Sequence, residues 1–192
     1  TEIRNDAQAE ILGFESDVVW RATEGLTFTG GLALTDAKLS ANDCGKTDAS
    51  GHPITVCPVG SPGFPTGPEA PDGTQLPVTP KFKANLTVRY EWTIGALDAH
   101  LQGSMVTQSS SWADLRILQR GILGKQDGWS SFDMTAGLEG DAWTAEFFVQ
   151  NLSDERADLT RYAQCPETVC GGAVYSVPNQ PRTIGLRLGH KF

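Results

Sequence analysis

Three polar residues at spacings of two and four positions could supply a hydrolytic site. Asp98, His100 and Ser104 carry the carboxylate, imidazole and hydroxyl groups that an activated serine nucleophile requires. If the segment is a strand, these side chains project from one face, and neighbours two positions apart stand in parallel about 7 Å from each other. No arrangement for stabilising an oxyanion accompanies them. We therefore interpret the set as the polar lining of a strand and predict that the chain is not an enzyme.

The four cysteines are the second group with chemical potential. Cys44 and Cys57 lie in one turn-rich segment, and Cys165 and Cys170 lie in another. Four cysteines allow three connectivities, and the favoured one is the local pairing Cys44–Cys57 and Cys165–Cys170, which indicates an oxidising compartment. Free thiols and a zinc site are the alternatives. The spacings lack a Cys-x-x-Cys pair and only His52 lies near a pair, so we expect no metal.

Aromatic and guanidinium side chains in the connecting segments are the candidates for holding a ligand. Arginine pairs with anionic chelates, and aromatic rings stack on catecholates and other ring systems. Exposed loops also carry such residues without a binding role, and the histidines His52 and His190 have weaker claims. The candidates on this basis are Trp112, Arg116, Arg120, Arg161 and Tyr162.

The composition narrows the classes of protein to which these residues can belong. The chain has 192 residues and a net charge of −8, which argues against a nucleic-acid partner. Apolar residues make up 39% of the chain and charged residues 20%, and no apolar run approaches the ~18 residues of a membrane-spanning helix. Residues 1–8 lack the apolar core of a signal peptide, and we expect that a leader has been removed.

The elements that must position these side chains are alternating strands. The segment 81–93 is the clearest, because Phe82, Leu86 and Tyr90 share one parity with other apolar residues, while its lysines and arginine share the other. Each segment with this pattern has one apolar and one polar face. The segments are 10–21, 26–34, 81–93, 97–107, 129–139, 143–149 and 181–192.

The connections between these segments alternate in length. Short turns alternate with long segments at about 38–79, 108–128 and 151–180. Strands of roughly 9–11 residues, with short turns on one side and long loops on the other, are typical of outer-membrane β-barrels. We therefore predict an all-β fold, an antiparallel up-and-down meander of about seven transmembrane strands that forms part of a barrel. Lipid would cover the apolar face, and the polar face would line the lumen with Lys81, Lys83, Arg89 and Arg187.

The direction of the last strand assigns a side to every loop. In an outer-membrane barrel the chain ends in the periplasm, so the long segments and both cysteine pairs are expected outside the cell. Indole rings then fall at both ends of the strands, as expected of girdles at the membrane interfaces. These residues are Trp20, Trp92 and Trp143 at the periplasmic end, together with the terminal Phe192, and Trp129 at the outer end.

Two other architectures have the same alternation of apolar and polar residues. A secreted soluble β-sandwich that binds sugars or proteins has one wet face per sheet, but it does not account for the alternating loop lengths or the aromatic strand ends. A passive porin-like channel is a closed barrel with an even number of strands, whereas seven is odd. Both remain open as alternatives to the first prediction.

Four stretches, in order, resemble TonB-dependent outer-membrane receptors. They are G-F-E-S-D-V-V-W (13–20), L-P-V-T-P-K-F-K-A-N-L-T-V-R-Y (76–90), W-T-A-E-F-F-V-Q-N-L-S-D-E-R (143–156) and P-R-T-I-G-L-R-L-G-H-K-F (181–192). Gly13 and Glu15 match a recurring Gly-x-Glu of the family. The other matches are Asn151, Leu152 and Asp154 to its Asn-Leu-x-Asp, and Phe192 to the terminal aromatic that the barrel-assembly machinery reads.

The resemblance implies active uptake of a large scarce nutrient, most often a ferric siderophore, across the outer membrane of a Gram-negative bacterium. Members have a barrel of about 22 strands with a plugged lumen, and TonB pulls on the plug. This chain shows neither a plug nor a TonB box, so residues 1–192 are expected to be the C-terminal part of such a barrel. Its expected partners are the missing plug and barrel strands, TonB through that plug, the barrel-assembly machinery, outer-membrane lipid and the siderophore. No cofactor is implied.

Overall fold

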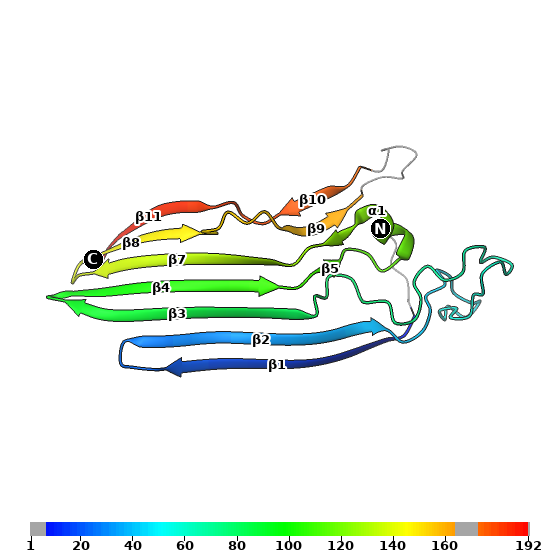
Figure 1. The fold of residues 1–192 in the computed structure, drawn as a ribbon, viewed down its shortest axis with the longest axis horizontal. Helices are drawn as coiled ribbons and strands as arrows, with labels where there is room; N and C mark the ends of the chain where they lie inside the picture. Colours follow the sequence, from blue (N-terminus) through cyan, green and yellow to red (C-terminus); the bar gives the residue numbers. More distant parts are fainter. Residues whose placement is uncertain (1–6, 164–172, 192) are drawn as a thin grey trace.

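The computed structural model describes residues 7–163 and 173–191, and its main element is one antiparallel sheet. Seven strands pair in the order β1-β2-β3-β4-β7-β8-β11 (Figure 1), which confirms the predicted all-β meander. The strands are β1 (Ala9–Arg21), β2 (Leu26–Leu39), β3 (Phe82–Ile94), β4 (Leu97–Gln108), β7 (Trp129–Glu139), β8 (Trp143–Gln150) and β11 (Thr183–His190).

The predicted strand bounds agree with the structure to within a few residues, except in β2. This strand continues to Leu39, and β1 pairs with it along that extension. The apolar side chains change sides there: Leu34 lies on the exposed apolar face, whereas Ala37 and Leu39 have the opposite parity and are buried. The prediction ended the strand at Leu34, because beyond that residue the apolar side chains change from even-numbered to odd-numbered positions.

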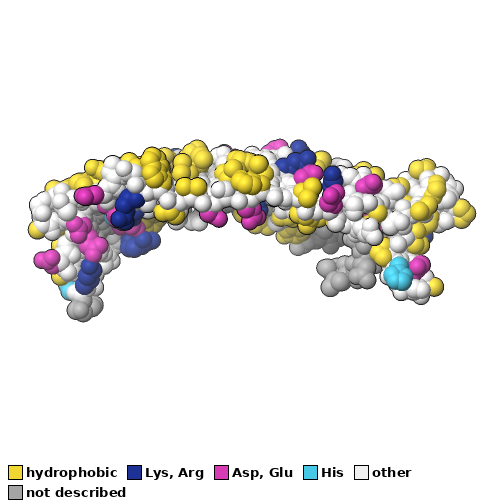
Figure 2. Space-filling model, turned by 90° about the horizontal axis from the view of Figure 1, so that it is seen from below, with side chains coloured by type: hydrophobic (Ala, Val, Ile, Leu, Met, Phe, Trp, Pro, Cys, Tyr) yellow, Lys and Arg dark blue, Asp and Glu magenta, His cyan; other side chains and the backbone are white. Residues whose placement is uncertain are grey.

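One face of the sheet is apolar and exposed. Cross-strand pairing aligns its side chains in rows, and Figure 2 shows hydrophobic side chains along the convex side of the arched sheet. Leu186, for example, is 65% exposed. A continuous exposed apolar face of this kind is what a wall that meets lipid presents. One row consists of Tyr90, Leu101, Ala136, Phe147 and Leu186.

The opposite, concave face carries polar rows. The strand register places His100, Gly137, Glu146 and Arg187 side by side on four neighbouring strands. The His100 ring lies across Gly137, where a Cβ atom would meet it at 2.2 Å. The ring thereby reaches Glu146, with Nε2 3.6 Å from Oε2, and Arg187 pairs with the other carboxylate oxygen. The predicted inward parity of Arg187 is consistent with this position.

The tight turns and the long loops lie at opposite ends of the sheet (Figure 1). At the turn end, Trp20 stacks on Phe28 and Trp92 stacks on Tyr90, each with ring centroids 5.2 Å apart. Trp143 begins β8 at this end, whereas Trp129 begins β7 at the loop end. The tryptophans therefore lie where the sequence placed them, and their role as membrane girdles stays a prediction. The predicted role of Phe192 falls outside the described residues.

The smaller elements all belong to the long loops. In the described part of the chain, the other two sheets have two strands each. Among the same residues, no helix combines the length and the apolar character needed to cross a membrane. The loop elements are β5 (Ser111–Trp112), α1 (Ile117–Leu123), β6 (Lys125–Gln126), β9 (Asp158–Tyr162) and β10 (Tyr175–Pro178), with β5 paired to β6 and β9 to β10.

Candidate ligand-binding site on the long loops

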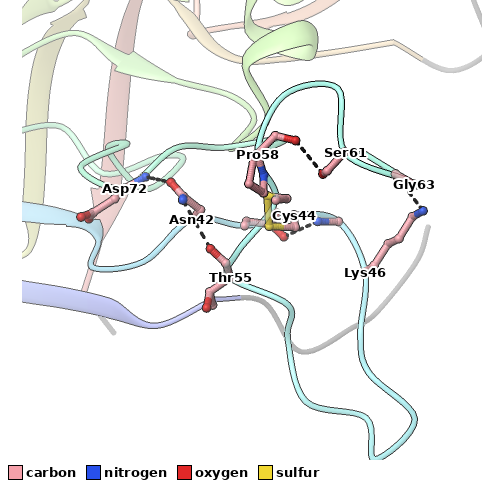
Figure 3. Close-up of a disulfide and its surroundings, with 11 residues drawn as sticks. Asn42, Cys44, Lys46, Thr55, Pro58, Ser61, Gly63 and Asp72 are labelled. Carbon is pink, nitrogen blue, oxygen red and sulfur yellow. Dashed lines mark hydrogen bonds between the residues drawn. A yellow bond between two sulfur atoms is a disulfide. The ribbon is translucent and has the colours of Figure 1, made fainter. Parts of the chain in front are cut away.

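The first long loop, residues 38–79, has a fixed fold despite its content of glycine, proline and polar residues. The Asn42 side chain donates a hydrogen bond to the Thr55 carbonyl (3.4 Å) and accepts one from the Asp72 amide (2.9 Å), as Figure 3 shows. These bonds join parts of the loop that are far apart in sequence. Side-chain hydrogen bonds to the backbone thus take the place of a strand ladder in this segment.

A disulfide between Cys44 and Cys57 closes the tip of the first loop (Figure 3), as predicted. Both cysteines are buried. The bond rules out free thiols and a zinc site at these two residues. No group of histidine, cysteine, aspartate and glutamate in the described residues is arranged to hold a metal ion. The predicted Cys165–Cys170 pair lies outside the described residues.

The second long loop, residues 108–128, is held to the first by Arg120. The Arg120 guanidinium carbon lies 5.0 Å from the centre of the Trp112 ring, and its Nε donates to the Asp114 carbonyl at 2.9 Å. A terminal nitrogen of Arg120 also donates to the carbonyl of Gln75 in the first loop. Burial lowers the pKa of Arg120, and the Asp114 carboxylate acts against that shift. Arg120 therefore joins an aromatic ring and two loops through one cation.

Arg116 is oriented by the side chain of Asp114. Its Nε and a terminal nitrogen donate to the two carboxylate oxygens at 3.1 and 3.0 Å, and its amide donates to the first oxygen at 2.9 Å. Burial raises the pKa of the Asp114 carboxyl, but the hydrogen bonds and charge of Arg116 outweigh it, so the pKa lies below its ordinary value. The pair is a fixed bidentate unit, and a ligand contact by Arg116 stays a prediction.

Gln126 connects the second loop to the third. It is 2% exposed, accepts a hydrogen bond from the Ser111 hydroxyl (3.0 Å) and donates one to the Leu159 carbonyl (3.0 Å). Its neighbour Lys125 is exposed and places Nζ 5.9 Å from the centre of the Trp112 ring. Sequence reasoning missed both residues, because a lysine and a glutamine after a glycine carry no periodic signal.

The third long loop, residues 151–180, contributes the β9–β10 hairpin. Arg161 pairs with Asp158 at 2.7 Å and donates to the Leu123 carbonyl at the end of α1 at 3.3 Å. Tyr162 stacks on Tyr175 of the partner strand, with ring centroids 5.8 Å apart. The three long loops are thus joined by side-chain hydrogen bonds, and we call them together the loop body.

The structure brings most of the predicted ligand residues to one place. Trp112, Arg116 and Arg120 surround the Asp114 turn, and Arg161 reaches the end of α1. Tyr162 instead contacts its own hairpin. A pocket of about 370 Å³ opens beside Arg116, between α1 and the first loop. Its lining residues are Thr66, Pro68, Glu69, Arg116, Ile117, Leu118 and Gln119.

Ser104 and His100, two of the residues considered for hydrolysis, each face a different partner. The hydroxyl oxygen of Ser104 lies 3.1 Å from that of Thr87, whereas His100 faces Glu146 across Gly137. The serine and the imidazole therefore do not form a nucleophile–base pair. This arrangement is what a polar lumen wall produces without a catalytic role.

A second recess of about 310 Å³ lies on the concave wall. Glu15 and Asp17 of β1 face Lys83 and Asn85 of β3 across it, with Gln108 of β4 at its edge. The alternation placed the four residues of β1 and β3 on the polar face, whereas Gln108 was assigned to the following loop. Their grouping depends on strand register, which sequence reasoning did not specify.

These features define one class of protein, a membrane β-barrel. The chain forms a segment of the barrel wall, and its loops at one end are folded into a polar and aromatic surface. The sequence profile of the TonB dependent receptor-like β-barrel family matches residues 1–152. The chain therefore belongs to the TonB-dependent receptor family. No curated protein matches it in a sequence search.

Solved structures with the same fold include three receptors. The ferric yersiniabactin uptake receptor FyuA from Yersinia pestis has a TM-score of 0.67 and 15% identity, over 94% of this chain and 23% of that one. The siderophore receptor PiuA from Acinetobacter baumannii has 0.64 and 17%, over 96% and 24%. The ferric-catecholate import receptor Fiu from Escherichia coli K12 has 0.61 and 16%, over 96% and 23%. The chain thus spans about a quarter of the length of these receptors.

Proposed function

We propose that this chain, over residues 1–192, is the C-terminal part of the barrel of an outer-membrane receptor that imports a ferric siderophore. The observation that carries the proposal is the loop body, a folded surface with cations and aromatic rings at the end of a wall with one apolar and one polar face. The family supports a receptor role, and the names of similar structures support a siderophore.

The chemistry of the loop body suits an anionic iron chelate. Trp112 offers a ring face next to two cations, Arg120 at 5.0 Å and Lys125 at 5.9 Å. Cations attract the charge of a chelate, and the ring stacks on its aromatic groups. Arg120 has an internal structural role as well, so Lys125 is the cation with more freedom to meet a ligand. Arg116, Arg161 and Tyr162 complete the proposed contacts.

The remaining partners follow from the same proposal. The rest of the barrel would pair with the two edge strands, β1 and β11, and a plug would fill the lumen against the concave wall. TonB would act through that plug, and lipid would cover the convex face. The barrel-assembly machinery would read the last strand. We place the receptor in the outer membrane of a Gram-negative bacterium, and we assign it no enzymatic activity.

The test is uptake of radiolabelled iron by cells that express the full-length receptor and lack other siderophore receptors. Ferric complexes of a tricatecholate and of a trihydroxamate serve as probes. We expect saturable uptake of at least one complex that disappears in a strain without TonB. Uptake that persists without TonB would instead support the passive porin-like channel, and no uptake of either complex would argue against a siderophore.

A matched pair of lysine variants tests the site. Lys125→Gln removes the exposed cation next to Trp112 and should weaken binding of the imported complex. Lys46→Gln is the control, because Lys46 also lies over an aromatic ring, that of Phe64 at 4.9 Å, but in the first loop. Equal effects of the two variants would contradict the assignment of Lys125 to the ligand site.

A further inference from the structure

Asn151, the residue that follows β8, is buried at the root of the β9–β10 hairpin. It is 4% exposed and has a φ of 50°, in the left-handed region that asparagine tolerates better than most residues. Its side-chain oxygen accepts from the Glu155 amide (2.9 Å), and its side-chain nitrogen donates to the carbonyls of Glu155 (2.9 Å) and Gln180 (2.8 Å). Its own amide donates to Asp133 of β7 at 2.8 Å.

These hydrogen bonds use both amide hydrogens and the oxygen of one side chain. They tie the segment that leaves β8 to the segment that returns to β11, and they anchor both to the wall at β7. Aspartate lacks the donors, glycine has only the backbone conformation in common, and glutamine carries the same groups on a side chain that is one methylene longer. Asn151 is thus a structural joint between the wall and the outer hairpin.

The two connections between the wall and the hairpin differ in length. Between the β8–β11 pairing and the β9–β10 pairing lie seven residues on one side, 151–157, and four on the other, 179–182. Unequal lengths on paired strands bend a ribbon, as a bulge does. Asp154, with a φ of 54°, closes the longer side by accepting from the Arg182 amide at 3.0 Å.

The hairpin contacts the second loop. Gln126 donates to the Leu159 carbonyl at 3.0 Å, and Arg161 donates to the Leu123 carbonyl at 3.3 Å. Figure 1 shows β9 next to α1 at the loop end of the sheet. The direction in which the hairpin leaves its root therefore decides whether Arg161 and its neighbour Tyr162 belong to the loop body.

We propose that Asn151 is a positioning residue for ligand binding: it aims the β9–β10 hairpin at the second loop and so completes the outer site. This inference rests on the proposed function, in which Arg161 and Tyr162 contact the ligand. Asn151 itself is buried, so its proposed effect on the ligand is indirect. The paired residues of β7, β8 and β11 end before it, so its side chain takes no part in the pairing of the wall.

The experiment measures the hairpin position directly in the full-length receptor, reconstituted in lipid vesicles. Spin labels replace Leu118 of α1 and Val177 of β10, both of which are exposed. With Asn151 present we expect one narrow distribution of label distances. Asn151→Gly keeps the backbone conformation and loses the side chain, and Asn151→Asp keeps only the acceptor. Both should broaden the distribution, while Asn85→Ala in the wall should leave it narrow.

A second measurement connects position to binding. The affinity of the same receptors is determined for the ferric tricatecholate and trihydroxamate complexes. If a variant holds its hairpin in place about a tenth of the time, its affinity should fall about tenfold. The amount of receptor in the outer membrane should stay unchanged, which separates positioning from failed assembly.

The outcomes distinguish the two proposals. Narrow distances in both variants would overturn the positioning role, whatever the ligand. Broad distances with unchanged affinity would show that the hairpin stands outside the site and would also overturn it. If the unsubstituted receptor binds neither complex, the proposed function fails, and broad distances in the variants would still support the structural joint.

Discussion

The loop body and the strand wall, the latter formed by the seven strands of the main sheet, differ in what they bury. The loop body has a small apolar core, in which Leu39, at the point where β2 enters it, is 1% exposed and the disulfide is buried, although side chains such as Val56 and Leu118 lie on its surface. In the wall Leu188 is 70% exposed, and polar side chains such as Glu146 face the concave side. The loop body therefore has a core of the kind found in proteins folded in water, whereas the wall presents an apolar face of the kind that meets lipid.

The difference extends to how each region is held together. The wall depends on backbone pairing between neighbours in sequence, so its side chains are free to face lipid or lumen. The loop body depends on buried or half-buried polar side chains that bond distant segments, such as Gln126 and Arg120. Substitutions should therefore act by different rules in the two regions, and the predictions below test that contrast.

The largest expected effect is a charge placed on the lipid face of the wall. Leu86 lies on the exposed apolar face of β3. Leu86→Arg should lower the free energy of unfolding by about 2–4 kcal/mol if that position is near the bilayer midplane. Denaturant unfolding of the full-length receptor in vesicles measures it.

The neighbouring residue provides the control. Thr87 has the opposite parity, and its hydroxyl lies 3.1 Å from that of Ser104 on the concave face. Thr87→Arg should cost much less than Leu86→Arg, because an arginine there meets the lumen rather than lipid. A larger cost for the Thr87 variant would reverse the assignment of the two faces.

The next effect is loss of the disulfide in the loop body. The bond links Cys44 to Cys57, separated by 13 positions, and removal of such a cross-link costs on the order of 3 kcal/mol in the chain-entropy model. Replacing both cysteines with serine should make the first loop sensitive to protease and leave unfolding of the wall unchanged. Val56→Ser, at an exposed site in the same loop, is the control. A loss of wall stability would show that the two regions are coupled.

A smaller effect is expected at the buried junction of the second and third loops. Gln126→Leu leaves the Ser111 hydroxyl and the Leu159 carbonyl without a partner, at a cost of about 1–3 kcal/mol. Hydrogen exchange should become faster in β5, β6 and β9 but not in the wall. Gln119→Leu on α1 is the matched control, because Gln119 is partly exposed. Equal protection from hydrogen exchange in the two variants would show that Gln126 does not stabilise the junction.

The contrast also explains what could be predicted from the sequence. The strands and faces of the wall were predictable because a period of two and tight turns are local signals, whereas the register between strands was seen only in the structure. The loop body was not, since its contacts join residues far apart, such as Arg120 with Gln75 and Gln126 with Leu159. Among the described residues of the loop body, the Cys44–Cys57 bond is the contact that was predicted, because its partners are close in sequence.

The candidate site shows the same division. Residue type alone found Trp112, Arg116 and Arg120, which the structure brings together. It could not show that both arginines have internal partners, nor that Lys125 reaches the same ring. In the sequence, Asn151 was notable only as part of a family motif. Its structural role follows from the hydrogen bonds of its side chain.

The smallest expected effect is a loosening of the β9–β10 hairpin in acid. The hydrogen bond from Arg161 is the main cause that lowers the pKa of the Asp158 carboxyl below its ordinary 3.8, against the effect of burial, and the Ser176 hydroxyl adds to it. A carboxyl with a lowered folded pKa stabilises the fold above its unfolded pKa, and that stability is lost as pH falls through the folded pKa. A spin label at Val177 should therefore become mobile below about pH 3.8.

Asp158→Asn should make the label mobile at every pH, whereas Asp127→Asn in the second loop should leave the acid step in place. An unchanged acid step in Asp158→Asn would assign the transition to another carboxyl, with Asp154 at the hairpin root the next to test, since the Arg182 amide lowers its pKa too.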